Sequence, residues 1–222
     1  MSIRSKKLAV LFIPAFIVVV IDQVTKYMVR TNPGLQRVEW IEGWLAFNFT
    51  KNPGMAMGMD WLSTFTISII AIVATIVIIG YIFFTLEKAN FGYLFCMGLI
   101  IGGALGNIGD RLFMAIIGGY GGLLEGHVVD FIHFTARIGD TPVFPYIFNV
   151  ADIAISTSII ILLLFHKKIM PVEAERDNES ESEGAKPEPE AQLQADSQIS
   201  GEEKVTAANH NSDDSRPGES GQ

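Results

Sequence analysis

The sequence contains a single cysteine, Cys96, among its 222 residues. An intrachain disulfide and a zinc site built from several cysteines are therefore excluded. Basic residues are also scarce, with 16 Lys and Arg against 24 Asp and Glu. This charge balance is too acidic for a nucleic-acid-binding protein, and we expect no nucleic-acid partner.

Charge and hydrophobicity divide the chain into two regions. Residues 171–222 contain 14 acids and four bases, a net charge of −10, and no Phe, Trp or Tyr. Such a segment cannot bury enough apolar surface to fold, so we expect a disordered acidic cytoplasmic tail. Residues 1–170 contain nearly every long apolar run. Their composition excludes a soluble globular enzyme and predicts a membrane domain.

Four segments of the first region are apolar enough to cross a bilayer, which requires about 20 residues per helix. They cover residues 8–27, 62–86, 91–108 and 147–165. The sequence therefore predicts an all-α membrane protein with four transmembrane helices.

Basic residues precede the first segment and follow the fourth: Arg4, Lys6, Lys7, Lys167 and Lys168. Because Lys and Arg near span ends favour the cytoplasmic side, both termini are expected to be cytoplasmic. The loops 29–61 and 109–146 then lie on the outer face. A cleaved signal peptide is the alternative for the N-terminus. No small-residue cleavage motif follows the apolar run, and we therefore expect an uncleaved helix.

Polar residues gather near the predicted outer ends of three helices: Asp22, Lys26, Asn107, Asp110, Arg111 and Asp152. Asp152 is five residues into the fourth predicted helix, about 7.5 Å from its outer end. Each charge in lipid costs roughly 2.5–3.5 kcal/mol, so such residues usually face a bundle interior or a wet cavity. Their common depth predicts a single polar site near the outer membrane surface.

Local spacing separates these charges into two kinds. Asp22 and Lys26 are four residues apart, so they can pair on one helical face in a structural role. Asp130 and Asp152 have no Lys or Arg three or four residues away in either direction. Two unpaired carboxyl groups in one cavity repel each other and can share a proton, as a two-carboxylate peptidase requires.

The predicted outer loops contain two further patterns. Residues 36–50 alternate polar and apolar side chains on both sides of Gly43. This alternation indicates a short periplasmic β-hairpin, with Trp40 and Trp44 at the membrane interface. An irregular loop with interfacial tryptophans fits the same residues nearly as well. Residues 118–122 are too rich in glycine for a stable helix. They fit a mobile flap and a slack connector equally well.

Five short motifs now occur in a recognisable order. They are Asp22-Gln23-Val24-Thr25-Lys26, Asn52-Pro53-Gly54-Met55-Ala56, Gly106-Asn107-Ile108-Gly109-Asp110-Arg111, Val128-Val129-Asp130-Phe131 and Phe148-Asn149-Val150-Ala151-Asp152. Together with the four spans, they resemble the lipoprotein signal peptidase family, also called signal peptidase II. The resemblance covers roughly residues 8–167.

The resemblance implies an activity and a substrate. Family members are aspartic endopeptidases of the bacterial cytoplasmic (inner) membrane. They cut a diacylglyceryl-modified prolipoprotein before its lipidated Cys, close to the outer face. Neither a cofactor nor a metal is implied. The expected partners are prolipoprotein substrates and membrane lipids, and the protein is expected to act as a monomer.

The resemblance also assigns roles to individual residues. Asp130 and Asp152 match the catalytic dyad. Substrate-binding or site-shaping positions are matched by Asn52, Gly54, Asn107, Arg111 and Asn149. Positions that support the site are matched by Asp22, Lys26 and Asp110. The chain departs from the family pattern at Met55 and Met57, where a small residue and an aromatic are more usual.

Two other classes of protein fit parts of the sequence. A membrane metalloprotease is suggested by His127, Asp130 and His133, because His and Asp bind zinc. On a helix, however, the two histidines would lie about 120° apart around the axis and would form a poor clamp. A small transporter or channel is suggested by the membrane charges, although the polar residues stop at the outer end.

Overall fold

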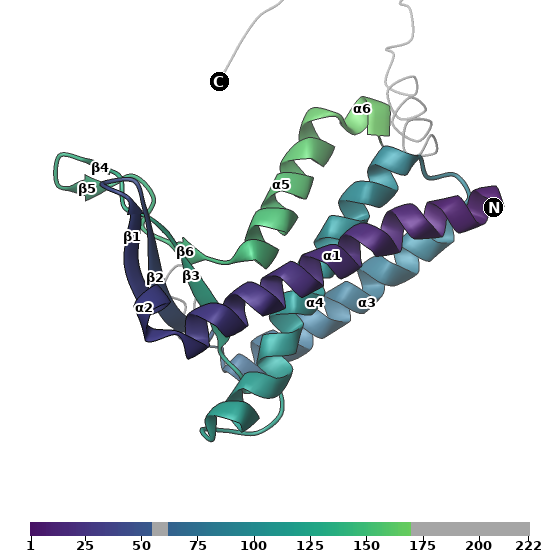
Figure 1. The fold of residues 1–222 in the computed structure, drawn as a ribbon. Coiled ribbons are helices and arrows are strands. Elements are labelled where there is room, and N and C mark those ends of the chain that lie inside the picture. The colour runs from purple at the N-terminus through teal and green to yellow at the C-terminus, as the bar shows by residue number, and fades with distance from the viewer. Residues whose placement is uncertain (55–61, 170–222) are drawn as a thin grey trace, which may run out of the picture. The chain divides into compact units, whose positions relative to one another are not determined.

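A computed structural model of the chain describes residues 1–54 and 62–169. The helices are α1 (Ile3–Thr31), α2 (Pro33–Gln36), α3 (Thr64–Thr85), α4 (Phe91–Gly118), α5 (Val150–Leu164) and α6 (His166–Ile169). The strands are β1 (Arg37–Ile41), β2 (Leu45–Asn52), β3 (Val128–Phe134), β4 (Arg137–Ile138), β5 (Thr141–Pro142) and β6 (Ile147–Phe148). Figure 1 shows the long helices side by side, with the strands gathered at one of their ends. The predicted tail, Met55 and Met57 lie outside the described residues.

Three helices of the described chain are long and apolar enough to cross a membrane: α1, α3 and α4. Each begins at an N-cap residue whose side chain accepts a backbone N–H bond from the first turn. The N-cap residues are Ser2, Ser63 and Asn90 respectively. Helix α5 is apolar but has only 15 residues, a rise of about 22 Å. Three of the four predicted spans are thus supported by length, and the fourth stays a prediction.

Three helices differ in their bounds from the sequence prediction. Helix α1, predicted over residues 8–27, extends from Ile3 to Thr31. Helix α4 continues to Gly118, so Asn107, Asp110 and Arg111 lie within it and not at its exit. The prediction was wrong because it treated these charges as the end of an apolar segment, whereas the helix buries Asp110 completely. Helix α5 begins at Val150, three residues later than predicted, so Asp152 lies in its first turn.

Glycine residues bring α4 close to its two neighbours. A Cβ atom on Gly102 would lie 2.6 Å from the Ala15 backbone oxygen of α1. A Cβ atom on Gly103 would lie 2.6 Å from the Ala151 backbone oxygen of α5. Small residues permit such backbone contact between membrane helices, where packing drives association. Helix α4 is therefore the central helix, packed against α1, α3 and α5.

The strands form a four-stranded sheet in the order β1-β2-β3-β6 and a separate two-stranded ribbon, β4-β5. Strands β1 and β2 pair antiparallel on either side of a turn at Gly43, whose φ of 71° favours glycine. This hairpin lies within the stretch that alternates in sequence. The prediction of one hairpin was incomplete, since β2 also pairs with β3, about 80 residues later in the chain.

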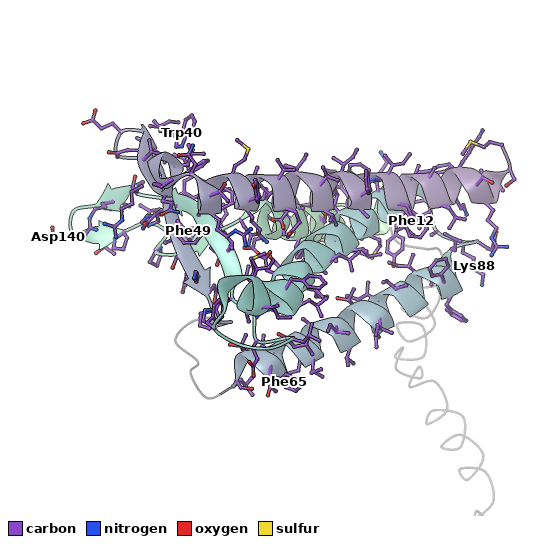
Figure 2. The ribbon with its side chains drawn as sticks, turned by 60° about the horizontal axis from the view of Figure 1, so that its bottom comes forward. Phe12, Trp40, Phe49, Phe65, Lys88 and Asp140 are labelled. Carbon is purple, nitrogen blue, oxygen red and sulfur yellow. The ribbon has the colours of Figure 1, made fainter. Side chains whose placement is uncertain are left out.

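The two ends of the helices differ in character. A hydrophobic cluster at the end near the N-terminus joins α1, α3 and α4 through Leu11, Ile82 and Leu94. A second cluster packs the sheet on the opposite end of α1 through Val29, Val129 and Phe131. Figure 2 shows Lys88 at the first end and Trp40, Phe49 and Asp140 at the second. The candidate functional residues lie where the sheet meets the helices.

Candidate active site

Asp130 and Asp152 reach the site from different kinds of structure. Asp130 is in strand β3 and is 2% exposed. Asp152 is the third residue of α5 and is half-buried. Within residues 1–54 and 62–169, neither carboxylate forms an ion pair. The structure thus brings together the two aspartates that lack basic neighbours in the sequence.

Asn149 connects the two carboxylates. It is the N-cap of α5, and its Oδ1 accepts the backbone N–H of Asp152 at 3.0 Å. Its Nδ2 is therefore turned away from the helix and donates to Asp130 Oδ1 at 2.6 Å. Its backbone N–H donates to Asp152 Oδ2 at 3.2 Å, which completes a capping box. One fully buried residue, 0% exposed, fixes both carboxylates.

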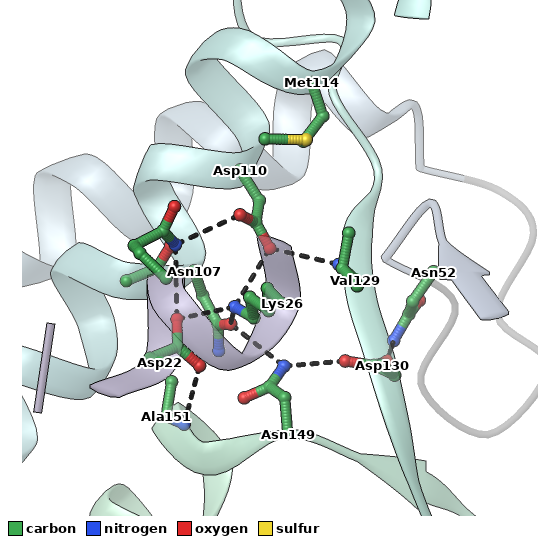
Figure 3. A network of polar contacts seen from close by, with 12 residues as sticks. Asp22, Lys26, Asn52, Asn107, Asp110, Met114, Val129, Asp130, Asn149 and Ala151 are labelled. Atoms are coloured by element: carbon green, nitrogen blue, oxygen red, sulfur yellow. Dashed lines mark hydrogen bonds and ion pairs between the residues drawn. The ribbon is translucent and has the colours of Figure 1, made fainter. Parts of the chain in front are cut away.

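Two further asparagines donate to the same pair. Asn52 accepts the Gly54 backbone N–H at 2.8 Å through Oδ1, which leaves its Nδ2 to donate to Asp130 Oδ2 at 3.0 Å. Asn107 donates from Nδ2 to Asp152 Oδ1 at 2.9 Å. Figure 3 shows Asn52 and Asn149 on opposite sides of Asp130. All four carboxylate oxygens therefore accept an N–H bond, and each keeps a lone pair for a proton or for water.

The environment of Asp130 favours its protonated form. Burial raises the pKa of Asp130 to about 6, and the nearby Asp152 carboxylate acts in the same direction. Hydrogen bonds from Asn52 and Asn149 oppose this increase because they stabilise the ionised carboxylate. A carboxyl group with such a pKa exchanges its proton close to neutral pH, as general acid–base catalysis requires.

A buried ionic network supports the site from the side of α1 and α4. Lys26 contacts Asp22 Oδ2 at 2.8 Å and Asp110 Oδ2 at 2.9 Å. The first is the pair predicted from the four-residue spacing. Both aspartates also fix other elements: Asp22 accepts the Ala151 N–H at 3.0 Å and Asp110 accepts the Val129 N–H at 3.0 Å. The network thus joins α1, α4, α5 and β3.

Sequence reasoning gave no role to Gln23, which also belongs to this network. Its Nε2 donates to Asp110 Oδ1 at 3.1 Å and to the Gly106 backbone oxygen at 3.0 Å. Its position beside Asp22 in the first motif was the available signal. Gly106 was also identified only as a member of a motif. A Cβ atom there would lie 2.5 Å from Asp22 Oδ2, so a larger residue would displace the Asp22 carboxylate.

Arg111 and Gly54 meet beside the dyad. A Cβ atom on Gly54 would lie 3.3 Å from Arg111 Nη1 and 2.6 Å from Ile67 Cδ1, so only glycine fits without a shift. Gly54 also has a φ of 109°. Arg111 Nη1 is buried and has no hydrogen-bond partner in the part of the chain that the structure describes. A buried unpaired donor beside two carboxylates is suited to binding a carbonyl oxygen of a ligand.

The two histidines considered as zinc ligands do not lie on the helix that was assumed from the sequence. His127, Asp130 and His133 lie in or next to strand β3, and not on a helix. In a strand, residues three apart point to opposite faces, so Asp130 and His133 lie on opposite faces of β3. His127 packs on the Tyr120 ring at 5.1 Å between centroids. The described residues contain no group of three His, Cys, Asp or Glu side chains placed to hold a metal.

The chain is similar in sequence to known proteins. Residues 14–167 match the family model described as signal peptidase (SPase) II. The lipoprotein signal peptidase of Porphyromonas gingivalis is 30% identical over 185 residues, covering 68% of this chain and 80% of the relative. That of Chlorobium phaeobacteroides is 32% identical and covers 71% and 95%. That of Rhodococcus jostii is 35% identical and covers 69% and 70%.

Solved structures agree with the fold. One bacterial membrane enzyme, determined by the in meso method at 2.3 Å, has a TM-score of 0.54 and 26% identity, covering 80% of this chain and 92% of the other. A second, determined at 1.9 Å, has a TM-score of 0.53 and 30% identity, covering 70% and 91%.

The apolar helices and these neighbours define the chain as a multi-pass bacterial membrane protein. Within that class, the chain belongs to the signal peptidase II family. Its function is accordingly that of a peptidase in lipoprotein processing.

Proposed function

We propose that the protein is an intramembrane aspartic endopeptidase. It removes the signal peptide from diacylglyceryl-modified bacterial prolipoproteins by cutting before the lipidated Cys. The observation that carries this proposal is the link through Asn149, which donates to Asp130 at 2.6 Å and to Asp152 at 3.2 Å. Two carboxyl groups held by one residue, without ion pairs in the described chain, can share a proton.

In the proposed reaction, one aspartate is ionised and takes a proton from the attacking water. The other is protonated and donates to the scissile carbonyl oxygen, giving a tetrahedral gem-diol intermediate. The roles then reverse as the leaving amine accepts a proton. The proton belongs to the coupled pair and is not assigned to Asp130 or Asp152.

Five residues are proposed to shape the substrate site: Asn52, Gly54, Asn107, Arg111 and Asn149. The three asparagines keep the dyad oriented, since each donates a hydrogen bond to it. Arg111 offers a buried donor for a substrate carbonyl oxygen. Gly54 leaves the space that this guanidinium needs.

The membrane arrangement is proposed from charge and length. Helices α1, α3 and α4 span the bacterial inner membrane, and residues 147–165, which include α5, form the fourth span. Arg4, Lys7 and Lys168 lie at the helix ends opposite the sheet, which favours cytoplasmic termini. The dyad and the sheet then lie near the outer face, where a lipid-anchored Cys is found. Residues 171–222 are proposed to form a cytoplasmic tail, and the active species is proposed to be a monomer.

The test is cleavage of a synthetic diacylglyceryl-Cys prolipoprotein peptide, analysed by mass spectrometry with a chelator present. Purified wild type is compared with Asp130→Asn, Asp152→Asn and the matched control Asp140→Asn. Asp140 is an exposed residue of the β4-β5 turn, so its substitution tests the chemical change alone. Cleavage before the lipidated Cys is expected from wild type and the control, and from neither dyad variant.

Three outcomes would reject the proposal. Cleavage by a dyad variant at the wild-type rate would exclude a two-aspartate mechanism. Inactivity of a well-folded wild type only when the chelator is present would favour a metalloprotease. Absence of cleavage under all conditions would direct attention to ion or proton flux in vesicles.

A further inference from the structure

Lys26 makes three contacts, of which two are enough to explain a structural role. Its ammonium group has three N–H donors and is 3% exposed. Two donors contact Asp22 and Asp110, which ties α1 to α4. The third donates to Asn107 Oδ1 at 2.9 Å and points toward the candidate active site.

The third contact fixes which way the Asn107 amide faces. Asn107 Oδ1 accepts from Lys26 and also from Asn149 Nδ2 at 3.2 Å. Both neighbours of this atom are donors, so the amide oxygen is held there and Nδ2 is held against Asp152 Oδ1. A flipped amide would place N–H groups against an ammonium and an oxygen against a carboxylate. Lys26, through the shorter of these two bonds, therefore helps to determine which end of the Asn107 amide faces Asp152.

We propose that Lys26 is a positioning residue for the reaction, acting through Asn107 to hold the Asp152 carboxylate in its working orientation. The proposal rests on the function proposed above, because the orientation of Asp152 matters only if Asp152 reacts. We call the chain of contacts from Lys26 through Asn107 to Asp152 the relay. The other charged residues near the relay are Asp22 on α1, Asp110 and Arg111 on α4, and Asp130 on β3. Of these, only Asp22 and Asp110 bind Lys26 directly.

The first test replaces the amide that the relay orients. Asn107→Asp has nearly the same shape and keeps an oxygen for Lys26, so the fold is expected to persist. It also places a second oxygen at the position of Nδ2, 2.9 Å from Asp152 Oδ1. Two carboxylates this close share one proton. We expect kcat to fall roughly tenfold or more at neutral pH and to recover as the pH is lowered. A wild-type pH profile would overturn the proposal.

The second test isolates Lys26. Lys26→Met alone would leave Asp22 and Asp110 unpaired and could prevent folding, so Lys26→Met is combined with Asp22→Asn, which restores the net charge of the trio. Asp22→Asn alone is the matched control, because Lys26 keeps its bonds to Asp110 and Asn107. We expect the double variant to have a kcat roughly tenfold below the control. Equal kcat values would overturn the proposal.

Coupling to Asn107 supplies the readout that a purely structural role would not give. The same pair of variants is measured in an Asn107→Leu background, where the relay is already broken. We expect Lys26→Met to cause no further loss of kcat there, since residues that act through one another are not additive. An equal additional loss in both backgrounds would place the effect of Lys26 elsewhere and would overturn the relay.

Parallel assays of Asp130→Asn and Asp152→Asn separate this proposal from the one on which it rests. If either variant cleaves like wild type, the dyad is wrong and the relay is overturned with it. If both are inactive but the Lys26 and Asn107 variants retain wild-type kcat and pH dependence, the dyad stands and only the relay is overturned.

Discussion

Substitution of Gly102 by alanine tests whether the site depends on close contact between α1 and α4. The added Cβ would lie 2.6 Å from the Ala15 backbone oxygen, 2.9 Å from Ala15 Cα and 2.9 Å from Val18 Cβ. Two of these three atoms are backbone, so the helices must separate. Overpacking a closely packed contact typically costs about 1–3 kcal/mol, and the backbone contacts favour the upper part of this range.

Helix separation should also reduce activity. Asp22 and Lys26 follow Ala15 by about two and three turns on α1. The contacts of Lys26 with Asp110 and Asn107 on α4 are both 2.9 Å long. We therefore expect Gly102→Ala to lower both the unfolding temperature and kcat. A loss near 3 kcal/mol corresponds to a decrease of roughly 6–12 °C for a chain of this size.

The assay can use the chain's single cysteine. Cys96 lies on α4 and is 2% exposed, so a thiol-reactive fluorophore reports its exposure on unfolding. Gly80→Ala is the matched control, because nothing lies within 4 Å of a Cβ there. Alanine is also favoured over glycine in helices by up to about 1 kcal/mol. If both variants unfold at the same temperature, the close contact of α1 with α4 does not contribute to stability as argued.

Three further predictions follow from the site and the tail. Because the pKa of folded Asp130 is about 6 and its ordinary value is 3.8, the free energy of unfolding should decrease by roughly 3 kcal/mol as pH rises from about 4 to about 6. Urea unfolding of Asp130→Asn should show a weaker dependence of this free energy on pH, and the same dependence as wild type would refute the raised pKa of Asp130. Arg111→Met should raise KM more than it lowers kcat, since Nη1 has no hydrogen-bond partner among residues 1–54 and 62–169. A pure kcat effect would contradict a binding role. Truncation after Met170 should leave peptide cleavage intact, and a large loss in equally stable protein would assign the tail a role.

Much of the architecture could be predicted because it depends on local sequence. Continuous apolar runs predicted the three helices that are long enough to cross a membrane. The four-residue spacing of Asp22 and Lys26 predicted an ion pair that measures 2.8 Å. Charge spacing also singled out Asp130 and Asp152, which form no ion pair in the described chain. These features need only neighbours within one or two helical turns.

The tertiary structure alone decided how the site is assembled. Asn52 binds Asp130 across 78 residues, Lys26 binds Asn107 across 81, and Asn107 binds Asp152 across 45. The β3 strand that carries Asp130 is specified by pairing with β2 and β6, which periodicity does not report. Asn149 became a helix cap because α5 begins at Val150. The sequence by itself determined which residues are charged, polar and able to react. Packing determined which of them touch, since contacts between distant segments follow from helix approach and strand pairing and not from local spacing.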